Sequence, residues 1–180
     1  MNARKNILTI AILTRNRPEY LAQSIDAALR QSFSDFTLQI YDDASDAGTA
    51  EAIKPFLKDP RVEYIRHSVC IGQSANYNAC IKNCVTDFLL ITHDDDRMKP
   101  DLASYALGVM QSRCSVNLVC TDYDVINASG IVIHQNKISK TYAFTHDHVY
   151  GRYEFILNFS KGINFICCPT VMLRVSAVRN

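Results

Sequence analysis

Three consecutive carboxylates, Asp94, Asp95 and Asp96, follow His93 at the end of the apolar run Phe88–Thr92. This run is typical of a buried strand, and Pro100 is well placed to open a helix after it. Open α/β sheets bind ligands at the carboxyl ends of their strands. Adjacent carboxylates repel one another unless a cation neutralises them, and hard oxygen ligands suit Mg²⁺ or Mn²⁺. The pattern predicts a divalent-metal site, with a solvated acidic loop before the helix as the alternative.

Three further polar clusters follow predicted strands, which span residues 7–13, 36–41 and 62–65. In chain order the clusters are Thr14-Arg15-Asn16-Arg17, Asp42-Asp43-Ala44-Ser45-Asp46 and Arg66-His67. Because parallel strands end on one edge of a sheet, we expect all four clusters to line one crevice. Carboxylates there can accept hydrogen bonds from a base or ribose, and arginines can neutralise phosphates. The chain has neither a GxGxxG after the first strand nor a GxxxxGK[ST], so the expected ligand is a nucleotide diphosphate with metal.

Helices must alternate with these strands to hold the clusters in place. We predict a helix from Pro18, one over residues 49–57 that Pro55 weakens, one through Tyr77 and Cys84, and one after Pro100. This alternation is typical of an α/β fold with a mostly parallel sheet.

The rhythm changes after about residue 115. We expect a strand over 116–125, a turn at 127–130 with a returning strand at 131–133, and a polar mobile loop over 134–150. A short helix over 153–159 and a last strand over 165–173 follow. The loop contains His146 and His148, which we interpret as surface residues in preference to metal ligands.

Composition excludes several classes of protein. The 180 residues are 48% hydrophobic and carry a net charge of +1, which indicates a globular chain with no electrostatic case for nucleic-acid binding. No apolar stretch approaches the roughly 20 residues that span a bilayer, and no convincing signal peptide is present. The seven cysteines are an odd number, which favours reduced thiols in a cytoplasmic protein. Cys80 and Cys84 fit a buried helix face better than a metal site.

The clusters, together with Asn76-x-Asn78, occur in the order and spacing of family 2 glycosyltransferases of the GT-A fold. The chain resembles this family from Ile7 to Leu107, with a weaker similarity at residues 168–174. The resemblance implies a GT-A (Rossmann-like), mostly parallel sheet flanked by helices, with a smaller mixed C-terminal part. It also implies inverting, hexosyltransferase-type transfer of a sugar from a nucleotide-diphosphate sugar to a glycan or lipid-linked acceptor.

The resemblance also implies roles for individual residues. Asp43 would read the base, Asp94 would lie near the ribose, and Asp95 and Asp96 would hold Mg²⁺ or Mn²⁺ at the position of the family's DXD motif. The metal would act as a Lewis acid on the leaving diphosphate. The resemblance implies a uridine nucleotide. Arg15 departs from the family pattern, because the family often has an aromatic residue at this position. The remaining residues of the implied nucleotide site are Thr14, Asn16, Arg17, Asp42, Arg66, and Asn76 or Asn78.

The family's general base is an acidic residue that follows the strand corresponding to residues 165–173. This chain ends at Asn180, so we expect the base to lie beyond it; Asp122 and Asp124 are the nearby substitutes, and we assign neither. We therefore interpret residues 1–180 as one domain, with a nucleotide-sugar-binding half at 1–114 and the start of an acceptor half at 115–180, in a fragment of a longer enzyme. Peripheral membrane association would belong to the longer form.

Two other functions are kept as alternatives. The first is a nucleotide-sugar-binding module without catalysis, which the missing base favours. The second is a nucleotidyltransferase, which usually brings a glycine-rich basic loop after its first strand, whereas residues 14–18 contain no glycine.

Overall fold

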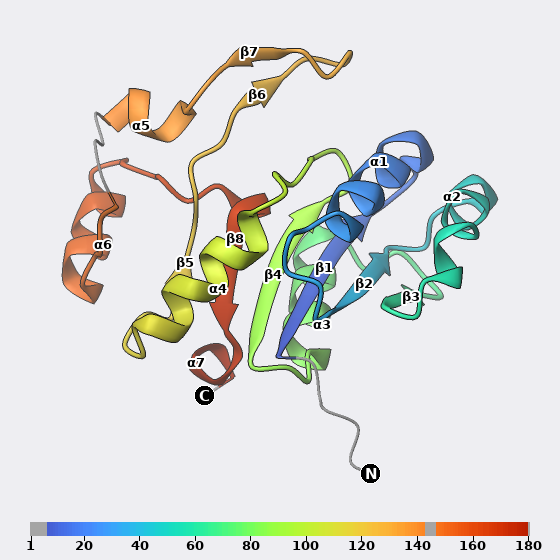
Figure 1. Ribbon diagram of the computed structural model, residues 1–180, viewed down its shortest axis with the longest axis horizontal. Coiled ribbons are helices and arrows are strands. Elements are labelled where there is room, and N and C mark those ends of the chain that lie inside the picture. The colour runs from blue at the N-terminus through green and yellow to red at the C-terminus, as the bar shows by residue number, and fades with distance from the viewer. Residues whose placement is uncertain (1–6, 143–146, 180) are drawn as a thin grey trace.

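The computed structural model describes residues 7–142 and 147–179. Its centre is a six-stranded sheet in the order β3-β2-β1-β4-β8-β5 (Figure 1). Strands β1 to β4 are parallel to one another, whereas β8 is antiparallel to both β4 and β5. The strands are β1 (Leu8–Thr14), β2 (Phe36–Asp42), β3 (Val62–Arg66), β4 (Phe88–His93), β5 (Leu118–Val119) and β8 (Val171–Arg174).

The central strand β1 is buried along its whole length, and it pairs with β2 on one side and β4 on the other. Parallel strands covered on both faces are hydrophobic without alternation, which is why residues 8–13 are nearly all apolar. The four strands predicted for the first half of the chain are therefore confirmed, each within a residue or two of its expected bounds.

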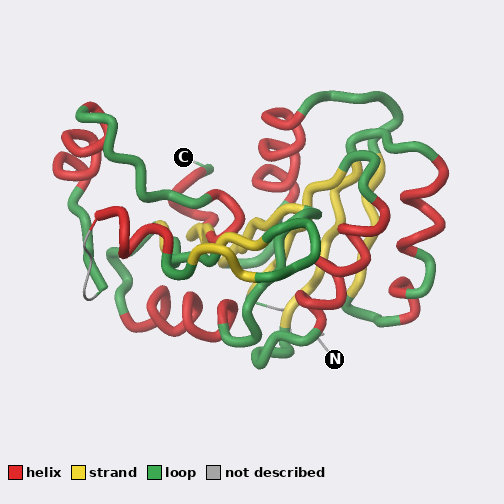
Figure 2. The backbone as a smooth tube through the Cα atoms, turned by 90° about the horizontal axis from the view of Figure 1, so that it is seen from above, coloured by secondary structure: helices red, strands yellow, loops and turns green. Residues whose placement is uncertain are grey.

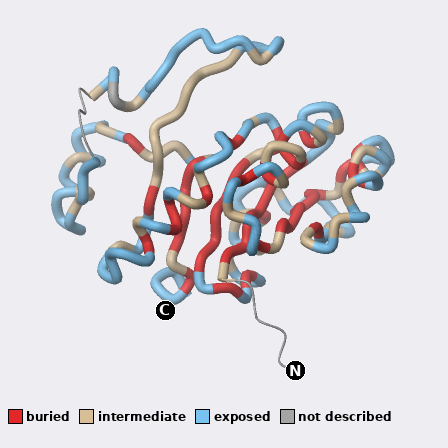
Figure 3. Tube along the Cα trace, viewed as in Figure 1, coloured by how far each residue is buried: buried red, intermediate tan, exposed pale blue. Residues whose placement is uncertain are grey.

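Helices cover both faces of the sheet, as Figure 2 shows from above. One face packs against α1 (Pro18–Leu29), α2 (Ala47–Ile53) and α4 (Leu102–Ser112), and the other against α3 (Gln73–Asn83) and the short α7 (Val175–Val178). Figure 3 shows the buried residues concentrated along the strands between these layers. Cys80 and Cys84 belong to the second core, as predicted for a buried helix face.

Two prolines act differently in the helices that they border. Pro18 occupies the first turn of α1, as predicted, whereas Pro55 separates α2 from the short 3₁₀ helix η1 (Phe56–Lys58). Pro100 lies two residues before α4, whose N-terminus is capped from elsewhere in the chain: the Ala103 amide donates 2.9 Å to Oε1 of Gln31, just after α1. This tertiary cap places the helix start later than the proline alone indicates.

The prediction of a strand over residues 116–125 is wrong for most of that range. Only β5 pairs in the main sheet, and β6 (Val125–Ile126) forms a separate hairpin with β7 (Val132–His134) around the predicted turn. Between β5 and β6 a side chain satisfies the backbone: the Thr121 amide donates to Thr170 Oγ1, which donates back to the Thr121 carbonyl. Because these groups are already paired, a sheet ladder is not needed there.

Residues 134–150 were expected to be irregular, but they include α5 (Lys137–Tyr142). Two acidic side chains from the preceding segment stabilise its start, since the Asn136 amide donates 2.9 Å to Asp124 and the Ile138 amide 2.8 Å to Asp122. Sequence periodicity does not reveal caps supplied from a distance. His146 lies outside the described residues.

The last elements also depart in part from expectation. The helix expected over 153–159 is present as α6 (Arg152–Ser160). The strand expected over 165–173 is confined to β8, because the 3₁₀ helix η2 (Cys168–Thr170), which contains Pro169, precedes it. Among residues 7–142 and 147–179, none of the helices combines the length and the hydrophobicity that a membrane span requires.

Candidate nucleotide and metal site

The predicted polar clusters meet at the carboxyl ends of β1, β2, β3 and β4. After β3 the chain returns to the other side of β1, so the strand order reverses between β1 and β4. At this switch point the Thr14 hydroxyl donates 2.8 Å to Asp94 Oδ2, and the Arg15 amide donates 3.3 Å to the same oxygen. Open α/β sheets bind ligands in the crevice outside such a point.

Asp94 is 5% exposed. Burial raises the pKa of its carboxyl group, although the Thr14 hydroxyl, the Arg15 amide and the Arg17 guanidinium favour the charged form. A negative charge on this buried side chain is therefore costly, and donors or cations of a ligand would stabilise it.

Asp43, at the end of β2, organises the loop that enters α3. Its Oδ1 accepts a 2.6 Å hydrogen bond from the Ile71 amide, and its Oδ2 accepts from the Gly72 amide at 3.0 Å and the Cys70 thiol at 3.3 Å. Burial raises the pKa of Asp43, but these donors and the nearby Arg15 outweigh burial and lower it. A carboxylate has about four acceptor positions, so one remains for a ligand.

Asp42 has a structural role beside Asp43. It is fully buried, and its carboxylate accepts hydrogen bonds from the Ser45 amide and the Tyr64 hydroxyl. The Arg66 guanidinium lies 3.7 Å from Asp42 Oδ2 and also donates 2.5 Å to the Ser45 carbonyl. Asp42 and Arg66 thus stabilise the turn after β2, whereas Asp43 stabilises the loop that leads into α3.

Asn16 links the loops after β1 and β2. Its φ of 55° lies in the left-handed region, which Asn tolerates better than most residues. Its amide donates 2.9 Å to Ser45 Oγ, and its Oδ1 accepts from the Asp46 amide at 2.8 Å. The two predicted clusters are therefore joined directly, with Arg15 exposed between Asn16 and the buried Thr14.

The two asparagines of Asn76-x-Asn78 are separated by the helix that carries them. Asn76 is buried, donates 3.1 Å to the Tyr41 carbonyl and pairs with His67 Nε2 at 2.9 Å. Asn78 is exposed, and two residues along α3 turn a side chain by about 200°. Asn76 therefore lies in the network behind the crevice, and the structure does not bring Asn78 to it.

A possible set of metal ligands lies after β4. One ligand atom from each of His93, Asp95 and Asp96 lies within 4.8 Å of the others. The motif predicted Asp95 and Asp96, but not that the imidazole of His93 would turn toward them. The His93 ring packs edge-on against Tyr77 of α3, whose hydroxyl contacts its Nε2, while its Nδ1 lies 3.5 Å from Asp96 Oδ2.

A protein cation already contacts part of this acidic group. The Arg17 guanidinium lies 3.3 Å from Asp94 Oδ1 and forms a close ion pair with Asp95. Asp94 and Asp95 raise the pKa of Arg17 further above its usual value. The charge distribution at the crevice therefore favours a cation at Asp95.

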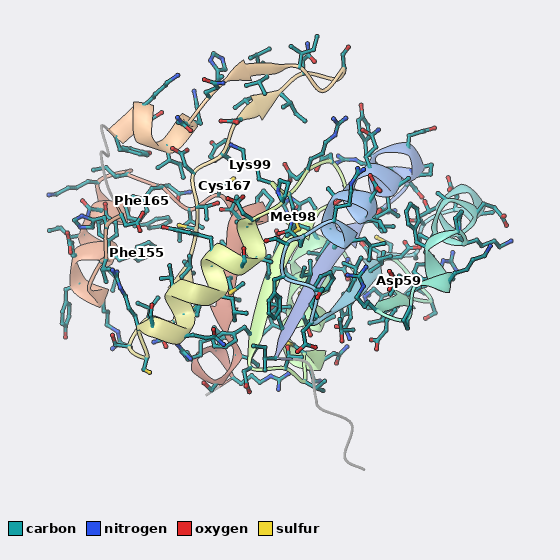
Figure 4. All side chains as sticks on the ribbon, viewed as in Figure 1. Asp59, Met98, Lys99, Phe155, Phe165 and Cys167 are labelled. Carbon is teal, nitrogen blue, oxygen red and sulfur yellow. The ribbon has the colours of Figure 1, made fainter. Side chains whose placement is uncertain are left out.

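Asp96 also lines a cavity of about 420 Å³, which lies between β4, the start of α4 and the segment 121–132. Figure 4 labels Met98, Lys99 and Cys167, which line it. Thr92 also lines the cavity; it is 1% exposed, and its hydroxyl has no hydrogen-bond partner among the described residues. A buried unpaired hydroxyl is costly, so Thr92 is a point at which a polar partner would lower the free energy of the protein.

Asp122 and Asp124, the nearby substitutes for the general base, both stabilise the local fold. Asp122 Oδ1 accepts hydrogen bonds from the Tyr123 and Ile138 amides, each at 2.8 Å. Asp124 accepts from the Asn136 amide and forms a 2.9 Å ion pair with Lys99. These contacts give both carboxylates structural roles at the cavity wall.

Two solved structures in complex with nucleotide sugars have a similar fold. The model superposes on Staphylococcus aureus TarS (residues 1–349, in complex with UDP-GlcNAc) with a TM-score of 0.74 and 16% identity, over 96% of this chain and 46% of that one. It also superposes on the mannosyltransferase PcManGT of Pyrobaculum calidifontis, in complex with GDP-Man and Mn²⁺, with a TM-score of 0.59 and 14% identity, over 75% of this chain and 46% of that one. The chain therefore has the GT-A fold of this class of enzyme.

The family itself follows from the sequence match. The model of "Glycosyl transferase family 2" matches residues 9–180, and the chain belongs to this family. It is 29% identical over 108 residues to the Escherichia coli protein named "Putative colanic acid biosynthesis glycosyl transferase WcaA", covering 58% of this chain and 38% of that protein. An "Uncharacterized glycosyltransferase" of Rickettsia felis is 27% identical over 123 residues, covering 68% and 20%. The chain thus spans well under half the length of these curated relatives.

Proposed function

We propose that the chain forms the nucleotide-sugar site of an inverting, metal-dependent glycosyltransferase that uses a uridine diphosphate sugar. The observation that carries this proposal is that Asp43 follows β2 while Asp94 and the Asp95–Asp96 pair follow β4, all at the carboxyl edge of one parallel sheet. The TarS fold relative in complex with UDP-GlcNAc supports the choice of nucleotide.

The nucleoside would lie across the ends of β1 and β2. Asp43 keeps one acceptor position for a base N–H, and its lowered pKa keeps it ionised. The exposed Arg15 can stack its guanidinium on the base, in place of an aromatic ring. Asp94 would accept a hydrogen bond from a ribose hydroxyl, which compensates for its buried charge.

The diphosphate would lie over the acids that follow β4. Two carboxylates and an imidazole form a donor set that suits Mn²⁺, and the carboxylates alone suit Mg²⁺. Asp95 and Asp96 would hold the ion, which supplies Lewis-acid stabilisation of the leaving diphosphate. When metal and nucleotide bind, we expect Arg17 to leave Asp95 and pair with a phosphate oxygen.

The reaction proposed is a single displacement. An acceptor hydroxyl attacks the anomeric carbon from the face opposite the diphosphate; the new C–O bond forms as the bond to the phosphate oxygen breaks. The hydroxyl proton passes to a base, and the diphosphate leaves with the bonding electrons. Arg17 would neutralise charge that grows on this leaving group. The sugar would extend into the cavity beside Thr92, toward a glycan or lipid-linked acceptor.

Calorimetric titration of UDP with and without Mn²⁺, with GDP and UMP for comparison, tests this proposal. We expect metal-dependent UDP binding that Asp95→Ala and Asp96→Ala each weaken by at least about tenfold. Asp87→Ala is the matched control, because Asp87 is an exposed acid just before the opposite end of the same strand. UDP binding that ignores metal and both site variants would contradict the metal-dependent site.

A binding module without catalysis is the second candidate. It is favoured by one observation, namely that Asp122 and Asp124 are both engaged in backbone or ion-pair contacts. The two candidates differ in turnover: a complete enzyme releases UDP from UDP-GlcNAc when an acceptor is supplied, whereas a module binds it unchanged. A cytoplasmic location is part of the proposal, supported by the seven free cysteines.

A further inference from the structure

We propose that His93 is a nitrogen ligand of the metal and that Tyr77 is the positioning residue that orients it. This inference rests on the metal-dependent function proposed above and adds to it the composition of the ligand set. An all-carboxylate site would need only the acids after β4. The structure adds an imidazole whose Nδ1 lies 3.5 Å from Asp96 Oδ2, in the same group as Asp95.

The orientation of the imidazole is fixed by contacts on its far side. Nε2 contacts the Tyr77 hydroxyl, and the two rings meet edge-on at 5.6 Å with an interplanar angle of 84°. If Nε2 carries the proton and donates it to the Tyr77 oxygen, Nδ1 presents its lone pair toward Asp96. A histidine that binds a metal commonly donates its second ring N–H in this way, which fixes tautomer and orientation.

Hydrogen bonds to other elements hold the backbone at His93 and the helix that carries Tyr77. The His93 carbonyl accepts a 2.9 Å hydrogen bond from Ser24 Oγ of α1, which holds the backbone at the end of β4. Tyr77 lies on α3, whose N-terminal loop is bound to Asp43 through the Ile71 and Gly72 amides. The contact between Tyr77 and His93 thus joins the metal ligands to the helix beside the nucleoside residues.

A nitrogen ligand has a chemical consequence. Mg²⁺ prefers oxygen ligands, whereas imidazole favours transition metals, and Mn²⁺ accepts a mixed set. With His93 in place, the site should bind Mn²⁺ more tightly than Mg²⁺. Without the imidazole the remaining carboxylates should discriminate less between the two ions.

The decisive measurement is electron spin-echo envelope modulation of Mn²⁺ bound to the full chain with UDP. A directly coordinated imidazole gives a characteristic ¹⁴N modulation, which we expect in the wild type and not in His93→Asn. Calorimetry with Mn²⁺ and Mg²⁺, each with UDP, gives the second readout. We expect His93→Asn to reduce the preference for Mn²⁺ over Mg²⁺, and Tyr77→Phe to weaken Mn²⁺ binding by about tenfold while keeping the ¹⁴N signal.

Matched controls separate ligation from loss of structure. Tyr105→Phe removes a tyrosine hydroxyl on α4 that bonds to Asp147, and His134→Asn removes an exposed imidazole on β7; neither should change metal binding. If the wild type binds Mn²⁺ through Asp95 and Asp96 without ¹⁴N modulation, the His93 inference is wrong and the proposed function stands. If the wild type binds no Mn²⁺ with UDP, both are wrong.

Discussion

The Thr14 hydroxyl donates a 2.8 Å hydrogen bond to the Asp94 carboxylate and thereby joins the carboxyl ends of β1 and β4. These strands are neighbours in the sheet but lie 80 residues apart in sequence. The bond holds a buried acid at the point where the strand order reverses, which is where we expect the ribose.

The substitution Asp94→Asn should maintain or raise the stability of the protein while it weakens UDP binding. Burial raises the pKa of Asp94, so its contribution to stability falls as pH rises through the usual value of about 3.9 toward the higher folded value. At pH 7 the variant should therefore unfold at the same or a higher temperature, measured by calorimetry. Its UDP affinity should fall about tenfold, the loss of one charge-assisted hydrogen bond. A lower melting temperature with unchanged UDP affinity would contradict this assignment.

Asp43→Asn should have the opposite effect on stability. The folded pKa of Asp43 is lowered, so its contribution is present above about pH 3.9 and is lost as pH falls through the folded value. We expect the variant to lose about 1–3 kcal/mol of unfolding free energy at pH 7, because hydrogen bonds from the Ile71 and Gly72 amides weaken. Urea unfolding at pH 7 and pH 3 measures the difference, which should be smaller at pH 3. Asp35→Asn, on an exposed loop, is the control.

Arg17→Gln should affect metal and nucleotide in opposite directions. The guanidinium contacts Asp95 and so competes with a metal ion for that carboxylate. Mn²⁺ alone should bind the variant several-fold more tightly, whereas UDP with Mn²⁺ should bind more weakly because a phosphate loses its arginine partner. Calorimetric titrations with Mn²⁺ alone and with UDP in the presence of Mn²⁺ measure the two affinities. Arg30→Gln, which breaks an ion pair with Asp26 at the far end of α1, should change neither.

Thr92→Val tests the cavity beside Asp96. The Thr92 hydroxyl is buried without a partner among the described residues, so valine of the same shape should stabilise the free protein by about 1 kcal/mol. If this hydroxyl bonds the sugar, UDP-GlcNAc affinity should fall several-fold while UDP affinity is unchanged. Thr49→Val removes a second hydroxyl that is buried without a partner in the described part of the chain, in α2 and away from the cavity. It should raise stability and leave both affinities as they were.

The sequence alone determined the α/β framework and the edge on which the polar clusters meet. Continuous apolar runs at residues 8–13 and 88–92 indicate strands buried on both faces, and a parallel arrangement places the residues after them together. Asp43 and Asp94 were therefore expected at the same edge of the sheet, and they do follow β2 and β4 there. These inferences hold because periodicity and strand direction are local properties of the chain.

Only the tertiary structure decided which atoms of these clusters are paired and which remain for a ligand. Asn76 and Asn78 looked equivalent in the motif, but α3 turns one into the core and the other to solvent. The helix α5 was missed because Asp122 and Asp124 help to cap it from a distance. Likewise, the His93 imidazole lies near Asp95 and Asp96 with its other edge against Tyr77 of α3. Such contacts depend on the approach of elements far apart in sequence, which local patterns do not encode.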